Sequence, residues 1–275
     1  MGIKDARPAN LAAGQFYGAV PEKRVVASSI LTEIIHHDRF NLPEHSHELA
    51  YFTLVLGGSY IESFGRKTDE HAPMTLLWHR AGIFHKDRIG ESGARCFTIE
   101  IQKSGMDSLE QLTKAPLDFA EIGTPLVWTA ARLFSEFKYW GDCSELIVEG
   151  LTLEMLGHAA RRASRIERRP PKWLGTIVER LEADFSERVS TSELAEDAGV
   201  HPVHLASVFR KFHGETIGEH VQRRRVTHAS KLLGLPEMPL ADIAYACGFS
   251  DQSHFTRIFK RCVGMTPGAF RTSLS

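Results

Sequence analysis

The chain has 275 residues, of which 43% are hydrophobic and 24% are charged, and its formal net charge is −1. This length allows two hydrophobic cores, and the composition is that of an ordinary globular protein. No apolar run reaches the roughly 18 residues that a membrane span needs, and residues 1–20 lack the layout of a signal peptide, so we expect a cytoplasmic protein without a membrane partner.

The two ends of the chain differ in charge. Residues 1–160 contain 15 Lys and Arg against 21 Asp and Glu, a net charge of −6. Residues 161–275 contain 18 Lys and Arg against 13 Asp and Glu, a net charge of +5. The C-terminal part is therefore the one whose charge suits an anionic partner such as nucleic acid.

Short apolar runs alternate with turns between His45 and Glu100. The runs cover residues 51–56, 60–64, 75–78 and 96–101, with Gly57-Gly58 and Gly65 between them. This pattern is typical of an antiparallel β-barrel or sandwich. We therefore predict an α+β protein whose N-terminal part is an antiparallel β-barrel with additional helices.

Three histidines in this region form a candidate site. His45 and His47 alternate onto one face of a predicted strand, and His85 follows 38 residues beyond His47, so the three imidazoles can converge. The stretch PEHSHELAYFTLVLGGSYIESFGR, together with Gly82 and His85, resembles a cupin-like domain. Cupin metal sites tend to place a glutamate where this chain has Phe52.

Three interpretations of this histidine cluster are open, and the missing glutamate speaks against a metal site. We predict that His45, His47 and His85 bind a small-molecule effector and that the protein has no cofactor. A metal ion bound by these histidines is one alternative, and purely structural imidazoles are the other. We interpret His36, His37 and His79 as structural.

Helical spacing of apolar residues returns after the predicted barrel. Leu126, Ala130, Leu133 and Phe137 form one stripe, and residues 146–160 are apolar on too many sides for a lone helix. We predict that helices at about 126–165 cover the barrel or a second subunit, which makes the protein a homodimer. Pro170-Pro171 should end this segment, so we divide the chain into domains 1–168 and 169–275.

The last third of the chain repeats itself about 50 residues apart. The first copy contains Leu194-Ala195, Gly199, Leu205, Phe209, Phe212, Gly214 and Thr216, and the second contains Ile243-Ala244, Gly248, Phe255, Phe259, Cys262, Gly264 and Thr266. Each copy predicts a helix, a glycine turn at positive φ and a second helix, at about 190–213 and 239–262.

Helix-start signals support this reading of each copy. Ser190-Thr191-Ser192-Glu193 has the pattern of a capping box, and Pro202 suits a first helical position. Ser250 and Asp251 are the expected caps in the second copy. We predict an all-α C-terminal domain with two helix-turn-helix units.

The second copy, LADIAYACGFSDQSHFTRIFKRCVGMTPGAFR, closely resembles the signature of AraC/XylS-type bacterial transcription regulators. The resemblance extends backwards through TIGEHVQRRRVTHASKLL and covers about 105 of the 275 residues. It implies a seven-helix DNA-binding domain whose two recognition helices enter successive major grooves of double-stranded DNA. It also implies that the N-terminal cupin-like domain senses the effector.

The apolar stripe predicts which side chains read bases. If Phe255, Ile258 and Phe259 face inward, the opposite face carries Gln252, Ser253, Thr256 and Arg257. In the first copy the same reasoning selects Val203, His204, Ala206 and Ser207, which suit thymine methyl groups or DNA shape. We predict contacts with the DNA backbone for Arg210, Lys211, Arg223, Arg224, Arg225 and Lys260.

These observations predict an effector-controlled, DNA-binding transcription regulator that is not an enzyme. As an activator it would also contact RNA polymerase. The alternative is a cupin-type metalloenzyme, oxygenase-like, fused to a DNA-binding module, and the absent glutamate speaks against it. No glycine-rich phosphate loop, GxSxG motif or CxxC pair indicates other catalytic machinery.

Overall fold

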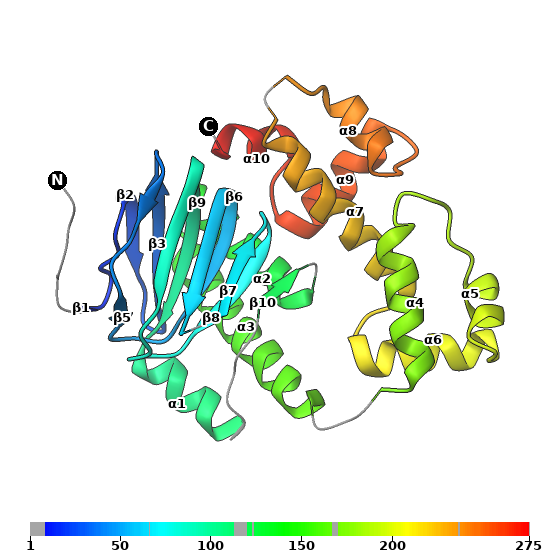
Figure 1. The fold of residues 1–275 in the computed structure, drawn as a ribbon, viewed down its shortest axis with the longest axis horizontal. Coiled ribbons are helices and arrows are strands. Elements are labelled where there is room, and N and C mark those ends of the chain that lie inside the picture. Colours follow the sequence, from blue (N-terminus) through cyan, green and yellow to red (C-terminus); the bar gives the residue numbers. More distant parts are fainter. Residues whose placement is uncertain are drawn as a thin grey trace. The chain divides into compact units, whose positions relative to one another are not determined.

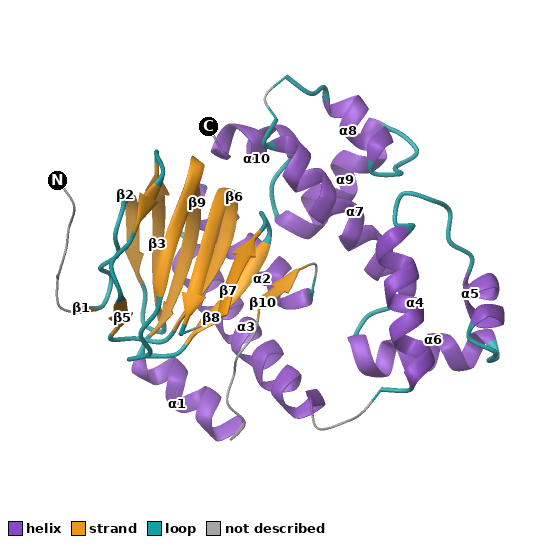
Figure 2. Ribbon diagram, in the orientation of Figure 1, coloured by secondary structure: helices purple, strands orange, loops and turns teal. Residues whose placement is uncertain are grey.

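The computed structural model describes residues 9–65, 67–112, 120–122, 124–166, 170–235 and 237–274. The chain forms two compact units, Met1–Ala160 and Arg161–Ser273. The first combines an antiparallel sheet with helices, and the second is helical (Figure 2). This confirms the predicted α+β class, whereas the predicted domain boundary at residues 168 and 169 lies outside the described residues.

The first unit is built on one large sheet with the strand order β10-β8-β6-β9-β3-β2 (Figure 1). In addition, β4 pairs with β9 and β7 pairs with β6, while β1 and β5 form a separate parallel pair. The strands are β1 (Ala9–Leu11), β2 (Ala19–Val25), β3 (Ser29–His36), β4 (Phe40–Asn41), β5 (His45–His47), β6 (Tyr51–Phe64), β7 (Lys67–His71), β8 (Thr75–His79), β9 (Lys86–Ile101) and β10 (Ala120–Ile122).

The predicted barrel does not close. In the described residues β2 and β10 are the two ends of the sheet and do not pair with each other. Alternating apolar residues identify strands, but they do not determine whether the first and last strand meet. A helix covers part of the sheet instead, because Phe97 of β9 packs its ring 5.3 Å from that of Phe134 and 5.2 Å from that of Phe137.

Three helices complete this unit, namely α1 (Lys103–Leu112), α2 (Pro125–Lys138) and α3 (Ser144–Ile166). The two predicted apolar helices are therefore present as α2 and α3. The pattern of α3 is divided, since Val148 and Met155 are buried whereas Leu146 and Leu153 are exposed. Among the described residues, no helix is long and apolar enough to cross a membrane.

The second unit consists of seven helices within the described residues, as the family resemblance implied. They are α4 (Lys172–Ala183), α5 (Thr191–Asp197), α6 (Pro202–His213), α7 (Ile217–Leu233), α8 (Leu240–Ala246), α9 (Gln252–Val263) and α10 (Pro267–Leu274). The pairs α5–α6 and α8–α9 are the two predicted helix-turn-helix units, and α7 joins them (Figure 1).

The two turns have the same backbone geometry. Gly199 has φ 63° and Gly248 has φ 75°, as the sequence predicted. In each helix-turn-helix unit the backbone carbonyl of a small buried alanine accepts a hydrogen bond across the turn. Val200 N donates to Ala195 O at 2.9 Å, and Phe249 N donates to Ala244 O at 3.0 Å. The alanines let the two helices of each unit approach closely, and the glycines allow the sharp reversal.

The helix caps agree only partly with the prediction. Asp251 caps α9 by accepting a hydrogen bond from His254 N at 2.7 Å, and Pro202 begins α6. The predicted capping box at Ser190 is wrong, because the Ser190 side chain makes no capping hydrogen bond. A capping box forms at α7 instead, where Thr216 and Glu219 bond each other's backbone N–H.

The turn glycines generate a prediction about stability. Replacing Gly199 with alanine strains a positive φ but meets no atom within 4 Å, whereas a Cβ on Gly248 would lie 2.1 Å from Ser186 O. We expect Gly199→Ala to lower the free energy of unfolding by roughly 1 kcal/mol and Gly248→Ala by about 3 kcal/mol or more. Urea unfolding of the full chain, followed by circular dichroism, measures both. Equal losses would contradict the close packing of Gly248 on Ser186.

Candidate functional site

Helix α9 has one buried and one exposed face. Phe255, Ile258 and Phe259 are buried. On the opposite face all four predicted base-reading residues reach the surface: Gln252, Ser253 and Arg257 are exposed, and Thr256 is half-buried. The exposed face lies toward the capped start of the helix, which is the end that a recognition helix presents to base edges.

Helix α6 repeats this division with different side chains. Leu205 and Phe209 are buried, and the predicted reading residues are exposed, with Val203 at 69%. These exposed residues are Val203, His204, Ala206 and Ser207. The exposed side chains of α6 are therefore small and partly apolar, whereas those of α9 carry hydrogen-bond donors and acceptors.

Helix α7 joins the two units as a continuous element of 17 residues, or about 25 Å. It contacts α4 and α6 as well as α8 and α9. Ile217, Val221, Ala229 and Leu233 are buried. The two reading helices are therefore attached to one rigid helix.

Arg225 of α7 has partners inside the unit. Its guanidinium donates hydrogen bonds to the carbonyl oxygens of Phe185 at 2.7 Å, Ser186 at 3.5 Å and Glu187 at 2.9 Å. Ser186 is also the residue against which Gly248 packs. Arg225 therefore holds in place the segment that supports the second turn.

The two neighbouring arginines are paired as well. Arg223 Nη1 lies 3.1 Å from Glu215 Oε2, and Arg224 forms an ion pair with Glu182. We predicted that Arg223, Arg224 and Arg225 contact the DNA backbone. The structure gives each of them a partner in the same unit, which supports a structural role for these three arginines. The phosphate-contact proposal is kept for the exposed residues Arg210, Lys211 and Lys260.

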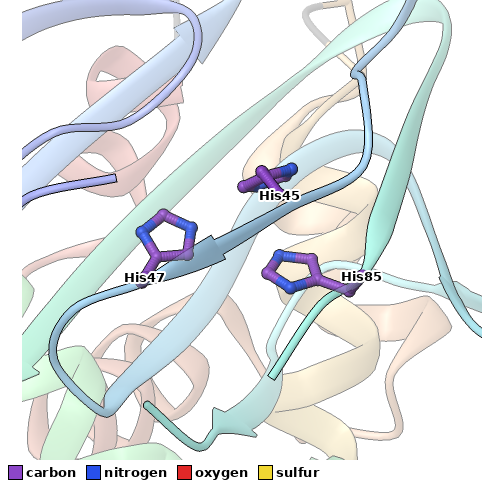
Figure 3. Close-up of side chains that lie close together, drawn as sticks. All are labelled: His45, His47 and His85. Atoms are coloured by element: carbon purple, nitrogen blue, oxygen red, sulfur yellow. The ribbon is translucent and has the colours of Figure 1, made fainter. Parts of the chain in front are cut away.

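The three predicted histidines of the first unit converge (Figure 3). One ring nitrogen from each of His45, His47 and His85 lies within 4.8 Å of the other two. His45 and His85 are also paired through their backbones, because each N–H donates to the other's carbonyl oxygen at 3.0 and 2.9 Å. All three side chains are buried.

Two acidic residues that the sequence analysis missed complete the cluster. Asp87 Oδ2 lies 3.7 Å from the Nε2 atoms of both His45 and His85. Glu62, which faces Asp87 across the β6–β9 register, lies 2.6 Å from Nε2 of His79. His-x-Asp spacing on a strand is the signal that was available for Asp87, because His85 and Asp87 share one face.

His79 belongs to this cluster, although the sequence analysis interpreted it as an unrelated structural residue. Its ring stacks on that of Tyr51 at 4.3 Å and lies 5.4 Å from that of His85. Nothing in the local sequence distinguishes His79 from His36 or His37. Its place follows from the pairing of β8 with β6, which brings His79 opposite Tyr51.

Burial sets the protonation of the cluster. Removal from water lowers the pKa of His47 and His85 to about 2 and that of His79 to about 3. Burial, reinforced by the nearby Glu62, raises the pKa of the Asp87 carboxyl well above its usual range. The imidazoles are therefore neutral at physiological pH, which is the form in which histidine binds metals and donates a single hydrogen bond.

The cluster borders a small cavity of about 30 Å³. Its lining includes Phe16, His45, His47, Tyr51 and Asp87. A cavity of this size has room for one or two water molecules, whereas pockets for drug-sized ligands measure roughly 300 to 1,000 Å³.

The structural role of Arg225 can be tested by comparing two basic residues. Arg225→Ala removes a charged donor from three partly buried or exposed carbonyl groups and should lower the free energy of unfolding by about 1.5 to 3 kcal/mol. Lys211→Ala, at an exposed position, should change it by less than about 0.5 kcal/mol. Thermal and urea unfolding of the two full-length variants provide the measurement. Wild-type stability of Arg225→Ala would return Arg225 to the candidate DNA contacts.

Comparison with known proteins adds the following similarities. Residues 194–273 match a family model described as a helix-turn-helix domain. A protein of Proteus vulgaris named probable transcription factor PqrA is 40% identical over 100 residues, which cover 36% of this chain and 78% of that protein. The HTH-type transcriptional activator AarP of Providencia stuartii is 34% identical over 93 residues, which cover 34% of this chain and 69% of that protein.

In a third relative the similar region is a smaller share of the protein. The HTH-type transcriptional regulator GlxA of Rhizobium meliloti is 35% identical over 95 residues, which cover 34% of this chain and 29% of that protein. In all three relatives the similarity covers about a third of this chain.

Proposed function

The chain belongs to the AraC-type family of helix-turn-helix transcription regulators, and we propose that it binds operator DNA through α6 and α9 under the control of an effector held in its N-terminal unit. The observation that carries this proposal is the pair of exposed helix faces attached to one rigid helix, α7. The relatives are named transcription factors, regulators and activators. This favours a regulator over the cupin-type metalloenzyme considered as the alternative.

We assign direct base reading to α9. Arginine pairs bidentately with guanine and glutamine with adenine, so Arg257 and Gln252 have the chemistry to discriminate base pairs in the major groove. Ser253 and Thr256 add shorter contacts on the same face. Lys260 is exposed one turn further along and suits a phosphate.

We assign a weaker selectivity to α6. Val203 and Ala206 offer apolar contact to thymine methyl groups, and His204 and Ser207 add polar groups. Arg210 and Lys211 lie in the last turn of the helix and suit phosphates. Most of the discrimination should therefore come from the half of the operator that α9 contacts.

Effector control and dimerisation are assigned to the N-terminal unit. His45, His47 and His85 are the proposed effector contacts, because all three are buried and His45 and His47 line a cavity there. The proposed dimer surface is the apolar side of α3, where Leu146 is 78% and Leu153 is 56% exposed in the single chain. A second copy of the chain would remove this apolar surface from water.

We further propose that the protein acts in the cytoplasm as an activator. The similar protein AarP is named a transcriptional activator. An activator in this role has RNA polymerase as a partner. A reporter gene placed behind the bound operator tests this, since deletion of the protein should lower expression.

The base-reading role of α9 predicts different outcomes for two cations on one helix. Arg257→Ala should weaken binding to the operator by about 1 to 3 kcal/mol and relax the preference at one base pair, because a bidentate base contact is lost. Lys260→Ala should weaken binding to operator and random DNA equally. It should also reduce the slope of log K against log salt concentration by about one, because one fewer phosphate contact releases counterions. Fluorescence anisotropy with operator and scrambled duplexes over a salt series measures both. An equal loss on the two duplexes for Arg257→Ala would make Arg257 a phosphate contact.

The α3 surface predicts a change of oligomeric state. The double variant Leu146→Glu with Leu153→Glu should sediment as a monomer at micromolar concentration, because two charges are placed in the proposed interface. Arg161→Glu, an exposed change on the same helix, should leave the dimer intact. A monomeric wild-type chain in the ultracentrifuge would show that α3 does not form a dimer.

A further inference from the structure

We propose that His45, His47, His85 and Asp87 form a binding site for one divalent transition-metal ion. The site would be made by β5, which supplies His45 and His47, and by the start of β9, which supplies Asp87 and follows directly after His85. This inference deepens the proposed function, because it names the class of the effector. Metal binding itself does not depend on the proposed function. Only the expected effect of the ion on DNA binding rests on it.

The distances suit a bound ion. Asp87 Oδ2 lies 3.7 Å from Nε2 of His45 and 3.7 Å from Nε2 of His85, and His47 brings a further ring nitrogen within 4.8 Å of these two imidazoles. Ligands about 2.1 Å from a tetrahedral ion are about 3.4 Å apart. The three imidazoles therefore lie close enough to share one ion, and the Asp87 carboxylate lies beside two of them.

The surrounding hydrogen bonds orient the imidazoles for this purpose. Nδ1 of His45 lies 2.9 Å from the carbonyl oxygen of Pro43, and Nδ1 of His85 lies 3.3 Å from that of Ile83. In a neutral ring, an Nδ1–H donated to a carbonyl leaves the lone pair on Nε2, the atom that faces Asp87. In His85 this Nε2 also lies 3.4 Å from the Tyr51 hydroxyl, which an ion would displace. Histidines that bind metals are held by the same kind of backbone contact.

Two polar atoms of the cluster have no hydrogen-bond partner within the described part of the chain, although the Asp87 carboxyl as a whole is hydrogen-bonded by Tyr60. Asp87 Oδ1 and His47 Nδ1 are buried and make no hydrogen bond within the described part of the chain. A buried polar atom without a partner costs about 1 to 3 kcal/mol. An ion or its bound water would satisfy both atoms.

The size and chemistry of the site favour a transition metal over other ligands. The adjoining cavity of about 30 Å³ accommodates an ion with a water molecule, but it is far smaller than the pockets of organic ligands. Imidazole nitrogens suit Zn²⁺, Ni²⁺, Co²⁺ and Fe²⁺, whereas Mg²⁺ and Ca²⁺ prefer oxygen ligands throughout.

The neighbouring pair Glu62 and His79 belongs to the surroundings of the site. These two side chains are already bonded to each other at 2.6 Å. Glu62 stands opposite Asp87 in the strand register, so its charge favours a cation at the centre. Asp87, which lies near two imidazoles, is the carboxylate that we place on the ion.

The test is a titration of untagged, EDTA-treated full-length protein with Co²⁺, followed by visible absorption. We expect one equivalent of Co²⁺ per chain, d–d bands typical of nitrogen and oxygen ligands, and a raised unfolding temperature. Asp87→Asn and His47→Ala should weaken Co²⁺ binding at least 10-fold, since a ligand is lost in each. His37→Ala, an exposed histidine outside the cluster, should bind Co²⁺ like the wild type.

Three results would overturn the proposed site. They are the absence of saturable Co²⁺ binding by the wild-type chain, an equal weakening by His37→Ala, and a loss of binding in Glu62→Gln that Asp87→Asn does not show. Because the wild-type titration decides the first of these, the proposal stays testable if a variant fails to fold.

DNA affinity, measured with and without Zn²⁺, separates this inference from the proposed function. A change of affinity on adding Zn²⁺ supports the ion as effector, and stoichiometric metal binding without such a change overturns that role. A protein that binds metal but no specific DNA would contradict the proposed regulator and leave the metal site standing.

Discussion

The DNA-binding unit depends on the packing of α7. Its buried residues, among them Val221 and Ala229, hold it against helices of both helix-turn-helix units. Arg225 on the same helix binds the carbonyl groups of residues 185–187, and Gly248 packs on Ser186. One helix therefore sets the spacing of α6 and α9 and supports the second turn.

The first unit depends on a different constraint, the removal of water from a polar cluster. The long strands β6 and β9 bring Glu62 and Asp87 opposite each other, and β5 adds His45 and His47. Buried groups of this kind are costly unless they have partners. Hydrogen bonds satisfy part of the cluster, and the unsatisfied atoms include one each of His47 and Asp87, two of the residues that we propose as ligands. In the described residues His45 and His85 make the isolated bridge outside the named strands, so an ion there would strengthen a sparse connection.

Local signals in the sequence were sufficient for the second unit but not for the first. Gly199 and Gly248 could be predicted because the positive φ of a turn is a property of a few adjacent residues. The capping box at Ser190 was predicted wrongly, because its sequence pattern does not ensure that the hydrogen bonds form. Thr216 and Glu219 have the same pattern, and there the capping hydrogen bonds do form. The open sheet and the membership of His79 and Asp87 in the cluster depend on strand pairing, which apolar alternation does not specify.

We propose that α7 places α6 and α9 one turn of DNA apart on one face of the duplex. Methylation interference at the guanines of the bound operator, with full-length protein, measures this most directly. We expect, within the site bound by each protomer, two groups of sensitive positions in successive major grooves, about 10 base pairs apart. A single group, or two groups about 5 base pairs apart on opposite faces, would contradict it.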